Sequence, residues 1–289
     1  MEIMVHDNRI PELDKLFEDV GTYRKSAEYR NLLDFIKRFP KMAPYNAMLV
    51  HIQKPGSQFV ASAHDWKVKY GRRPKVGARP LVILRPFGPV AFVFELNDTE
   101  GAPFPEALLE PFKAEGNITE NKLEDFKSSL LYEGVTVVEQ DYGTSMAGFV
   151  GPIEETFKYK TMNKSELFYV FFSIVVNRNL KPSEKMATLF HELGHVFCGH
   201  VYQPKAKWLP QRYFLSKNEK EFEAESVSWL LCERLGIVNP SSKYLSGYLD
   251  SNEEIPSISI DLVLKTVGLI ESIMSGRKTL RKELLVKKS

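Results

Sequence analysis

The chain has 289 residues, enough for two globular domains of ordinary size, and its apolar fraction of 43% and charged fraction of 26% are typical of a folded protein. Its net charge of +2 excludes no class of partner. A membrane-spanning helix is excluded, because the longest apolar stretch, residues 168–176, is about half of the ~18 residues that a span needs. The opening residues mix charges of both signs and lack an apolar run, so we expect no secretory signal and a cytoplasmic location.

The first half is predicted to contain a helical region and a hairpin. Residues 10–38 are expected to be mainly helical, because their apolar residues recur at helical spacing. Residues 80–94 predict two strands around an RPFGP turn. Residues 97–117 carry three prolines and two glycines, which is typical of a connector. We therefore predict an N-terminal α/β domain at residues 1–117 and a second domain at residues 118–289.

The second half is predicted to be a small sheet followed by helices, an α+β layout. The expected elements are a helix at 120–131, strands at 135–138, 146–150 and 168–176, and helices at 182–198, 219–235, 244–249 and 259–274. Both cysteines, Cys198 and Cys232, fall in these helices. This placement is typical of buried thiols in a reducing compartment.

The helix at residues 182–198 carries an HExxH motif, HELGH at 191–195. Residues four apart share a helical face, so His191 and His195 can both reach one metal ion. Glu192 is rotated by about 100° from His191, given ~3.6 residues per turn, so its carboxylate lies beside the ion, where it can take a proton from water. The alternative is a pair of ordinary hydrogen-bonded histidines on a half-buried helix.

The helix at residues 219–235 offers the third ligand. Glu221 and Glu225 are four apart on a helix that is otherwise strongly apolar, and a buried carboxylate there needs a cation or a hydrogen-bond donor. We predict Glu221 as the ligand and Glu225 as the group that orients a ligand histidine. The alternative is an exposed acidic stripe with Glu223 on its wet side.

Neighbouring residues are given lesser roles. A metzincin-type site would need histidine where Val201 stands, so this class is excluded. Cys198 is expected to be a packing residue, and His200 to be a structural or wall residue rather than a ligand. By proximity in sequence, the candidates for stabilising an oxyanion are His200, Tyr202 and Tyr213.

At this point the motifs can be compared with known families. The sequences ATLFHELGHVFCGH and EFEAESVSWLLCERLGI resemble the zincin-like metallopeptidase domains of the ImmA/IrrE group, whose third ligand falls on Glu221. Residues 43–53 and 61–87 resemble the N-terminal, single-stranded-DNA-binding domain of ArdC-type antirestriction proteins. The resemblance implies a zinc-dependent peptidase joined to a domain that binds single-stranded DNA.

Charge in the first half is compatible with a nucleic-acid partner. Seven basic residues lie between Val60 and Val90 against one acid, Asp65. Single-stranded nucleic acid binds to basic grooves lined by aromatic rings. The expected contact residues are Tyr45, Trp66, Lys67, Lys69, Tyr70, Arg72, Arg73 and Lys75. The alternative makes Trp66 a core anchor and the lysines a solvated loop.

These patterns predict a cytoplasmic metalloendopeptidase that acts on a protein or peptide. The resemblance implies that it is coupled to single-stranded-DNA binding, in an antirestriction-like or stress-response role. The ion is expected to be Zn²⁺, with Mn²⁺ as an alternative for two nitrogens and one carboxylate. Two other functions stay open: a non-enzymatic DNA-shielding protein with a structural metal site, and a regulatory peptidase that cleaves one repressor. The presence of Glu192 favours an enzyme, since a structural site needs only ligands.

Overall fold

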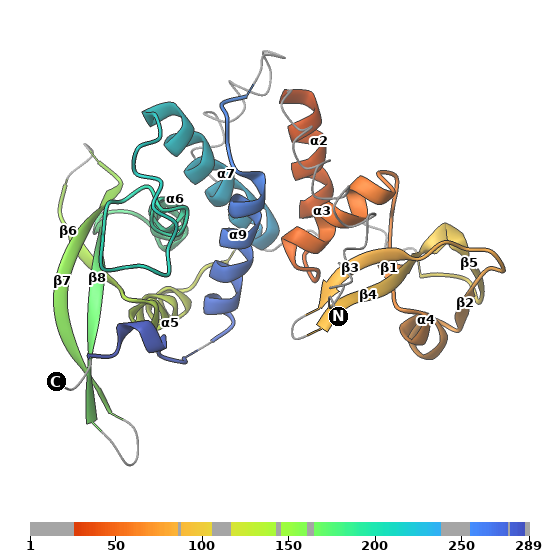
Figure 1. The fold of residues 1–289 in the computed structure, drawn as a ribbon, viewed down its shortest axis with the longest axis horizontal. Coiled ribbons are helices and arrows are strands. Elements are labelled where there is room, and N and C mark those ends of the chain that lie inside the picture. Colours follow the sequence, from red (N-terminus) through yellow and green to blue (C-terminus); the bar gives the residue numbers. More distant parts are fainter. Residues whose placement is uncertain are drawn as a thin grey trace, which may run out of the picture. The chain divides into compact units, whose positions relative to one another are not determined.

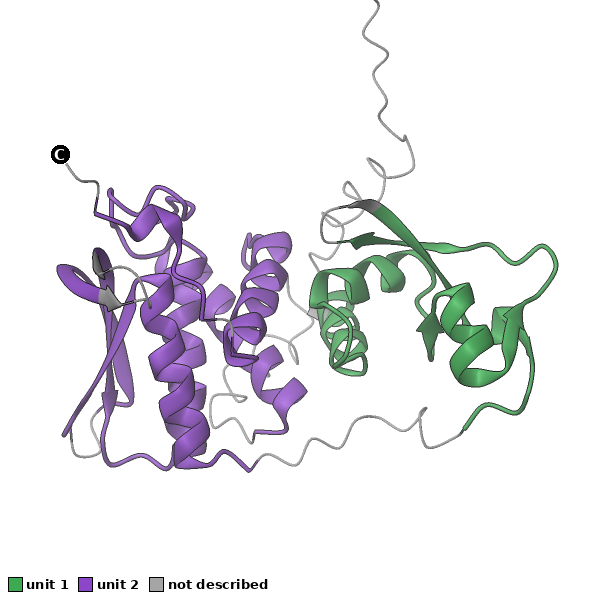
Figure 2. Ribbon diagram, turned by 90° about the horizontal axis from the view of Figure 1, so that it is seen from below, with its two compact units in different colours: residues 1–112 green, residues 113–289 purple. Residues whose placement is uncertain are grey.

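The computed structural model of the chain describes residues 26–85, 88–105, 117–142, 146–160, 165–237, 255–276 and 278–286. The chain divides into two compact units, residues 1–112 and residues 113–289 (Figure 2). Both units combine helices with small sheets, so the α+β class predicted from the sequence is confirmed. The assignment of separate functions to the two parts stays a prediction.

The described part of unit 1 contains two small antiparallel sheets and the helices α2, α3 and α4. Its elements are α2 (Ser26–Lys37), α3 (Pro44–Gln53), β1 (Val60–Ala61), α4 (Ala63–Tyr70), β2 (Arg72–Pro74), β3 (Leu81–Arg85), β4 (Gly88–Glu95) and β5 (Thr99–Gly101) (Figure 1). The first sheet has the order β1-β4-β3, and β2 pairs with β5. The expected hairpin corresponds to β3 and β4, and the expected N-terminal helix to α2. Residues 10–25 and the turn residues 86–87 lie outside the described residues.

The edge of β3 that does not face β4 is covered by two amide side chains from α3. Asn46 Nδ2 donates to Leu84 O at 3.0 Å, and the Leu84 N–H donates to Asn46 Oδ1 at 2.9 Å. Gln53 forms the same pair of bonds with Val82, both at 2.8 Å. Asn46 and Gln53 are seven residues apart and so lie on one face of the helix. The backbone groups that an edge strand leaves unpaired are therefore satisfied within the chain.

Unit 2 contains a three-stranded sheet and the helices that carry the HExxH motif. Its elements are α5 (Glu120–Leu130), β6 (Val135–Gln140), β7 (Gly148–Lys160), β8 (Ser165–Asn177), α6 (Pro182–Phe197), α7 (Lys217–Leu235) and α9 (Ile260–Met274). The sheet has the order β6-β8-β7, with β6 parallel and β7 antiparallel to β8. In Figure 1, α5 and α6 lie beside this sheet, and α6 packs against α7, which packs against α9. The expected helix at residues 244–249 lies outside the described residues.

The last described segment of the chain packs back onto unit 2. Arg281 Nε donates to Glu133 Oε2 at 2.8 Å, and Glu133 is buried. The Val286 N–H donates to Leu167 O at 3.0 Å, so the terminal segment bonds to β8 beyond the stretch that pairs with β6. Arg281 therefore has an internal role, although it belongs to the basic run that ends the chain. Among the described helices, none is both long and apolar enough to cross a bilayer.

Candidate metal centre

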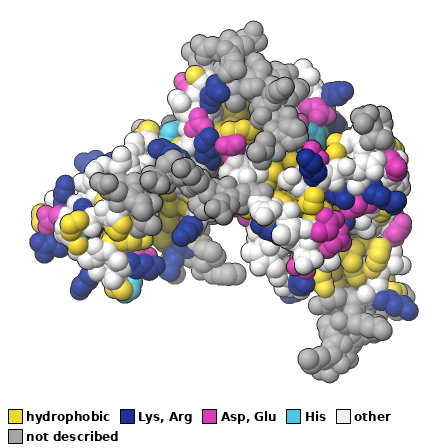
Figure 3. Space-filling model, turned by 180° about the vertical axis from the view of Figure 1, so that it is seen from behind, with side chains coloured by type: hydrophobic (Ala, Val, Ile, Leu, Met, Phe, Trp, Pro, Cys, Tyr) yellow, Lys and Arg dark blue, Asp and Glu magenta, His cyan; other side chains and the backbone are white. Residues whose placement is uncertain are grey.

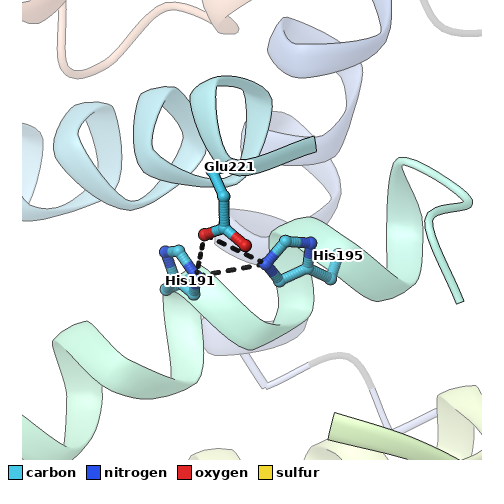
Figure 4. Close-up of side chains that lie close together, drawn as sticks. All are labelled: His191, His195 and Glu221. Atoms are coloured by element: carbon cyan, nitrogen blue, oxygen red, sulfur yellow. Dashed lines mark hydrogen bonds and ion pairs between the residues drawn. The ribbon is translucent and has the colours of Figure 1, made fainter. Parts of the chain in front are cut away.

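The three predicted ligands meet between α6 and α7 (Figure 4). His191 Nε2 and His195 Nε2 are 3.1 Å apart. Glu221 Oε2 lies 3.4 Å from the first and 3.8 Å from the second of these nitrogens. The two helices thus bring two imidazoles and one carboxylate to a single point.

The chain forms the two helices for local reasons. Helix α6 has Pro182 in its first turn, where a missing N–H removes no helical bond, and Glu184 accepts a hydrogen bond from the Lys181 N–H at 2.8 Å. Helix α7 begins with a capping box formed by Ser216 and Glu219 and ends at Gly236, which is left-handed with φ 66°. These start and stop residues fix the stretch of chain over which each ligand is presented.

Gly194 sets the distance between the helices. A Cβ atom added to it would lie 2.9 Å from Ala224 Cα, so the two backbones are in contact at this point. Gly194 precedes His195, and Ala224 lies between Glu221 and Glu225. The close approach therefore allows the carboxylates of α7 to reach the imidazoles of α6.

Gly194→Ala is expected to lower the free energy of unfolding. Overpacking at such a contact costs about 1–3 kcal/mol, which exceeds the gain of about 1 kcal/mol from replacing a helical glycine by alanine. Urea unfolding measures the difference. Gly151→Ala is the matched control, since nothing lies within 4 Å of a Cβ added there. An equal loss in both variants would contradict the role given to the helix contact.

The three residues fit a zinc ion. Two imidazole nitrogens and one carboxylate are a known catalytic ligand set, and bonds of ~2.0–2.1 Å in a tetrahedron place ligand atoms about 3.3 Å apart. The observed separations of 3.1, 3.4 and 3.8 Å lie around this value. The side chains of His191, His195 and Glu221 are 19%, 13% and 32% exposed, so solvent reaches each of them.

Glu192 lies beside these residues rather than among them. It is 8% exposed, and the backbone of Val150 on β7 lies near enough to affect the pKa of its carboxyl. Burial and the charges of Glu221 and Glu225 raise the pKa of the Glu192 carboxyl to about 7, against the opposing effects of His191 and the Val150 N–H. A carboxyl group that titrates near neutrality is suited to exchanging protons with a substrate.

Glu225 lies against the outer nitrogen of the first histidine. Its Oε1 is 3.2 Å from His191 Nδ1, which is the geometry predicted for an orienting carboxylate. Burial by itself lowers the pKa of His191, but hydrogen bonds to Glu221 and Glu225 raise it to about 10. Because a metal must displace the proton that this imidazole holds, metal affinity should fall as the pH is lowered.

Glu223 departs from the expected exposed stripe. It is fully buried and accepts hydrogen bonds from Arg212 Nη1 at 2.6 Å and Nη2 at 2.7 Å. His200 Nε2 lies 2.8 Å from it, and His200 Nδ1 lies 3.0 Å from His195 Nδ1. The exposed-stripe alternative is therefore wrong. Sequence reasoning missed this network, although the rule that a buried carboxylate needs a partner applies to Glu223 as it does to Glu221.

The oxyanion candidates have different surroundings. Both ring nitrogens of His200 are engaged, so it is not free to donate to a substrate. Tyr202 and Tyr213 are 55% and 45% exposed and pack edge to face with ring centroids 4.7 Å apart. Cys198 is fully buried beside Thr266, and burial raises the pKa of its thiol to about 12, as expected for a packing residue.

Of the aromatic residues expected to stack on bases, Trp66 and Tyr45 are buried inside unit 1 and Tyr70 is half-buried. Trp66 is fully buried, and its indole N–H donates to Phe94 O at 2.8 Å. Tyr45 is 8% exposed, and Tyr70 packs against Trp66 at 5.3 Å between ring centroids. Because no face of Trp66 is open to a base, Trp66 is a core anchor here, and the stacking role predicted for it and for Tyr45 is corrected.

The expected basic residues divide into two groups. The guanidinium of Arg72 donates to Thr99 Oγ1 at 2.9 Å and to Thr99 O at 2.8 Å, so it holds β2 against β5. The others are exposed. Lys69 pairs with Asp65, Arg73 pairs with Glu100, Lys75 donates to Asn97 O, and Lys67 lies on α4. Arg72 is thus a structural residue, and the exposed group stays a prediction for nucleic-acid contact.

Comparison with known proteins finds a family similarity over part of the chain. Residues 134–231 match the family model of the IrrE N-terminal-like domain, Peptidase_M78. The match covers α6 and most of α7, with all three predicted ligands, and confirms the resemblance that their motifs indicate. The crystal structure of the antirestriction ArdC protein from the R388 plasmid, in a metal-free form, is similar with 15% identity, a TM-score of 0.35 and coverage of 80% of this chain and 81% of that one. No curated protein matches the chain.

Proposed function

We propose that unit 2 is a zinc-dependent metallopeptidase, with the ion held by His191, His195 and Glu221. The observation that carries the proposal is the convergence of their three donor atoms at separations of 3.1–3.8 Å. The family match over residues 134–231 supports the peptidase class. Mn²⁺ is an alternative occupant of the same donors.

The chain's own residues supply the proton transfers. Zinc, when bound, polarises a peptide carbonyl and provides a nucleophile at neutral pH. The Glu192 carboxylate would take a proton from the attacking water and return it to the leaving nitrogen of the cleaved peptide bond. Glu225 holds the ring of His191 in place at Nδ1 throughout.

The sheet favours an extended peptide as the substrate. In the described part of unit 2, β7 pairs only with β8, so it is an edge strand, and the backbone of its Val150 lies near the Glu192 carboxyl. An extended peptide can add to such an edge through main-chain hydrogen bonds. This arrangement would bring a peptide bond close to the Glu192 carboxylate.

A comparison of proteomes tests the proposal. Cells expressing the wild-type chain are compared with cells expressing Glu192→Gln, and cleaved proteins are identified by their new termini. A single cleaved protein would indicate a regulatory peptidase, and several would indicate a broader one. The absence of any cleavage, together with zinc binding by the purified chain, would favour a non-enzymatic protein with a structural metal site.

For unit 1 we propose binding of single-stranded DNA. The proposed contact surface is the face of the sheet β1-β4-β3 that bears Phe92, rather than the buried residues Tyr45 and Trp66. Phe92 on β4 is 55% exposed and lies opposite Val82 on β3. Arg85 ends β3 and is exposed, and α4, which bears exposed Lys67, packs against β4. Figure 3 shows a face of this unit on which hydrophobic side chains lie among Lys and Arg side chains. Together with the metallopeptidase, this surface supports an antirestriction-like or stress-response role.

Phe92→Ala is expected to weaken binding of single-stranded DNA by about 1–3 kcal/mol, because one base loses its stacking partner. Fluorescence anisotropy with a labelled oligonucleotide at several salt concentrations measures the effect, and the salt dependence itself should be unchanged, since phosphate contacts remain. Val76→Ala is the matched control, because Val76 is fully exposed and carries no ring. If the two variants bind DNA equally well, Phe92 is not part of the DNA-contact surface.

A further inference from the structure

A buried chain of polar side chains leads from the second histidine of the HExxH motif into unit 2. His195 Nδ1 lies 3.0 Å from His200 Nδ1, and His200 Nε2 lies 2.8 Å from Glu223 Oε2. The side chains of His200 and Glu223 are 1% and 0% exposed. Arg212 pairs with both oxygens of Glu223, at 2.6 and 2.7 Å. Apart from His195, these residues lie outside the proposed ligand set, and the proposed reaction has so far given them no role.

For two neutral imidazoles, the donors and acceptors of this chain determine which ring nitrogen carries each proton. The Glu223 carboxylate can only accept, and besides His200 it accepts from Arg212 and from the Ser259 N–H at 2.7 Å. His200 must therefore donate through Nε2, and a neutral ring then accepts at Nδ1. It follows that His195 donates through Nδ1. The remaining nitrogen, His195 Nε2, keeps its lone pair and lies toward Glu221 and His191.

We propose that His200 is a positioning residue for the metal centre: with Glu223 and Arg212 behind it, it holds the ring orientation and the proton of His195, so that Nε2 is presented to the ion. The inference rests on the proposed function, because it concerns a ligand of the proposed zinc ion. Imidazole ligands commonly donate their second N–H to a carboxylate or carbonyl group. Here an imidazole stands between the ligand and the carboxylate.

The geometry of α7 explains why an intermediate ring is required. Glu225 shares a face with Glu221 and reaches His191 directly at 3.2 Å. Glu223 is two residues away and so points to a different side of the helix. His200 spans this gap. The residue before it is Gly199, which has a positive φ of 77°. A Cβ atom at this position would lie 2.0 Å from the carbonyl oxygen of Pro210, so only glycine fits here.

Zinc affinity of the full chain tests the inference. His200→Phe keeps a ring of similar size but removes both polar contacts, and it is expected to lower zinc affinity by about 10–100-fold, measured by competition with a chromophoric chelator. His200→Gln offers one acceptor and one donor and should recover part of this loss. Should the phenylalanine variant not fold, His200→Asn replaces it, because its shorter amide can reach only one of the two partners.

A second measurement separates positioning from general stability. The rise in Tm on adding zinc reports binding to the folded state, whereas the Tm in EDTA reports the fold alone. His200→Phe should reduce the zinc-dependent rise. Cys198→Ala is the control, because Cys198 lies in the same buried cluster and contacts Thr266 at 3.5 Å. It should lower both Tm values and leave zinc affinity unchanged.

The outcomes distinguish this inference from the proposed function. If the wild-type chain binds zinc and a folded His200→Phe chain binds it equally well, the positioning role is overturned and the metallopeptidase proposal is untouched. If the wild-type chain binds no zinc, the proposed metal centre is itself overturned. A loss of affinity in His200→Phe with partial recovery in His200→Gln supports the inference.

Discussion

Glu192→Gln is expected to lower peptide hydrolysis by about 10²–10⁴-fold while leaving close to one zinc ion bound per chain, because the amide cannot accept the proton of the attacking water. Glu221→Ala should lose both activity and metal, since it removes one of three donors. The measurements are hydrolysis of the cleaved protein that the proteome comparison identifies, and metal content by atomic emission after dialysis.

Glu225→Ala extends this comparison. It should weaken zinc binding by roughly tenfold or more without abolishing it, because His191 keeps its ligand nitrogen but loses the carboxylate 3.2 Å from its other nitrogen. Equal metal content in Glu221→Ala and Glu192→Gln would contradict the ligand role of Glu221. If Glu225→Ala loses the metal and Glu221→Ala retains it, the roles of the two carboxylates are exchanged.

Glu223→Ala is expected to destabilise the fold by about 3–5 kcal/mol, as for other buried ion pairs from which one partner is removed. The change leaves the Arg212 guanidinium, the His200 ring and the Ser259 N–H without their shared acceptor. The measurement is urea unfolding in the presence of EDTA, so that differences in zinc binding do not contribute.

Glu219→Ala is the matched control for this prediction. Glu219 lies one turn earlier on α7, and its side chain only completes the capping box with Ser216 near the solvent. Its loss should cost about 0.3–1.5 kcal/mol. A similar loss in the two variants would show that Glu223 contributes no more than an ordinary helix-cap residue.

Local sequence patterns predicted the ligand helices well, and the reason is physical. The HExxH spacing, the Pro182 start and the Gly236 stop act within a few residues, and the structure places α6 at Pro182–Phe197 and α7 at Lys217–Leu235. The convergence of Glu221 with the histidines was also predictable, because a carboxylate on an apolar helix requires a partner. Its identity as a metal ligand stays a prediction.

Contacts between distant parts of the chain could not be predicted in the same way. Arg72 and Trp66 belong to a basic and aromatic stretch, and only the folded chain shows that Thr99 and the Phe94 carbonyl occupy their polar groups. Charge and aromatic content describe what a side chain can bind. They do not show whether the chain's own backbone already binds it.

The amide pairs between α3 and β3 determine how unit 1 can meet other molecules. Strands with free edges recruit further strands, which leads to intermolecular sheets and aggregation. Asn46 and Gln53 occupy one edge of the sheet β1-β4-β3, and the strand at the other edge, β1, is only two residues long. A strand from another molecule therefore cannot add at the β3 edge, and the two-residue β1 offers few backbone groups for pairing at the other edge. The surface of this sheet that remains for association is its face.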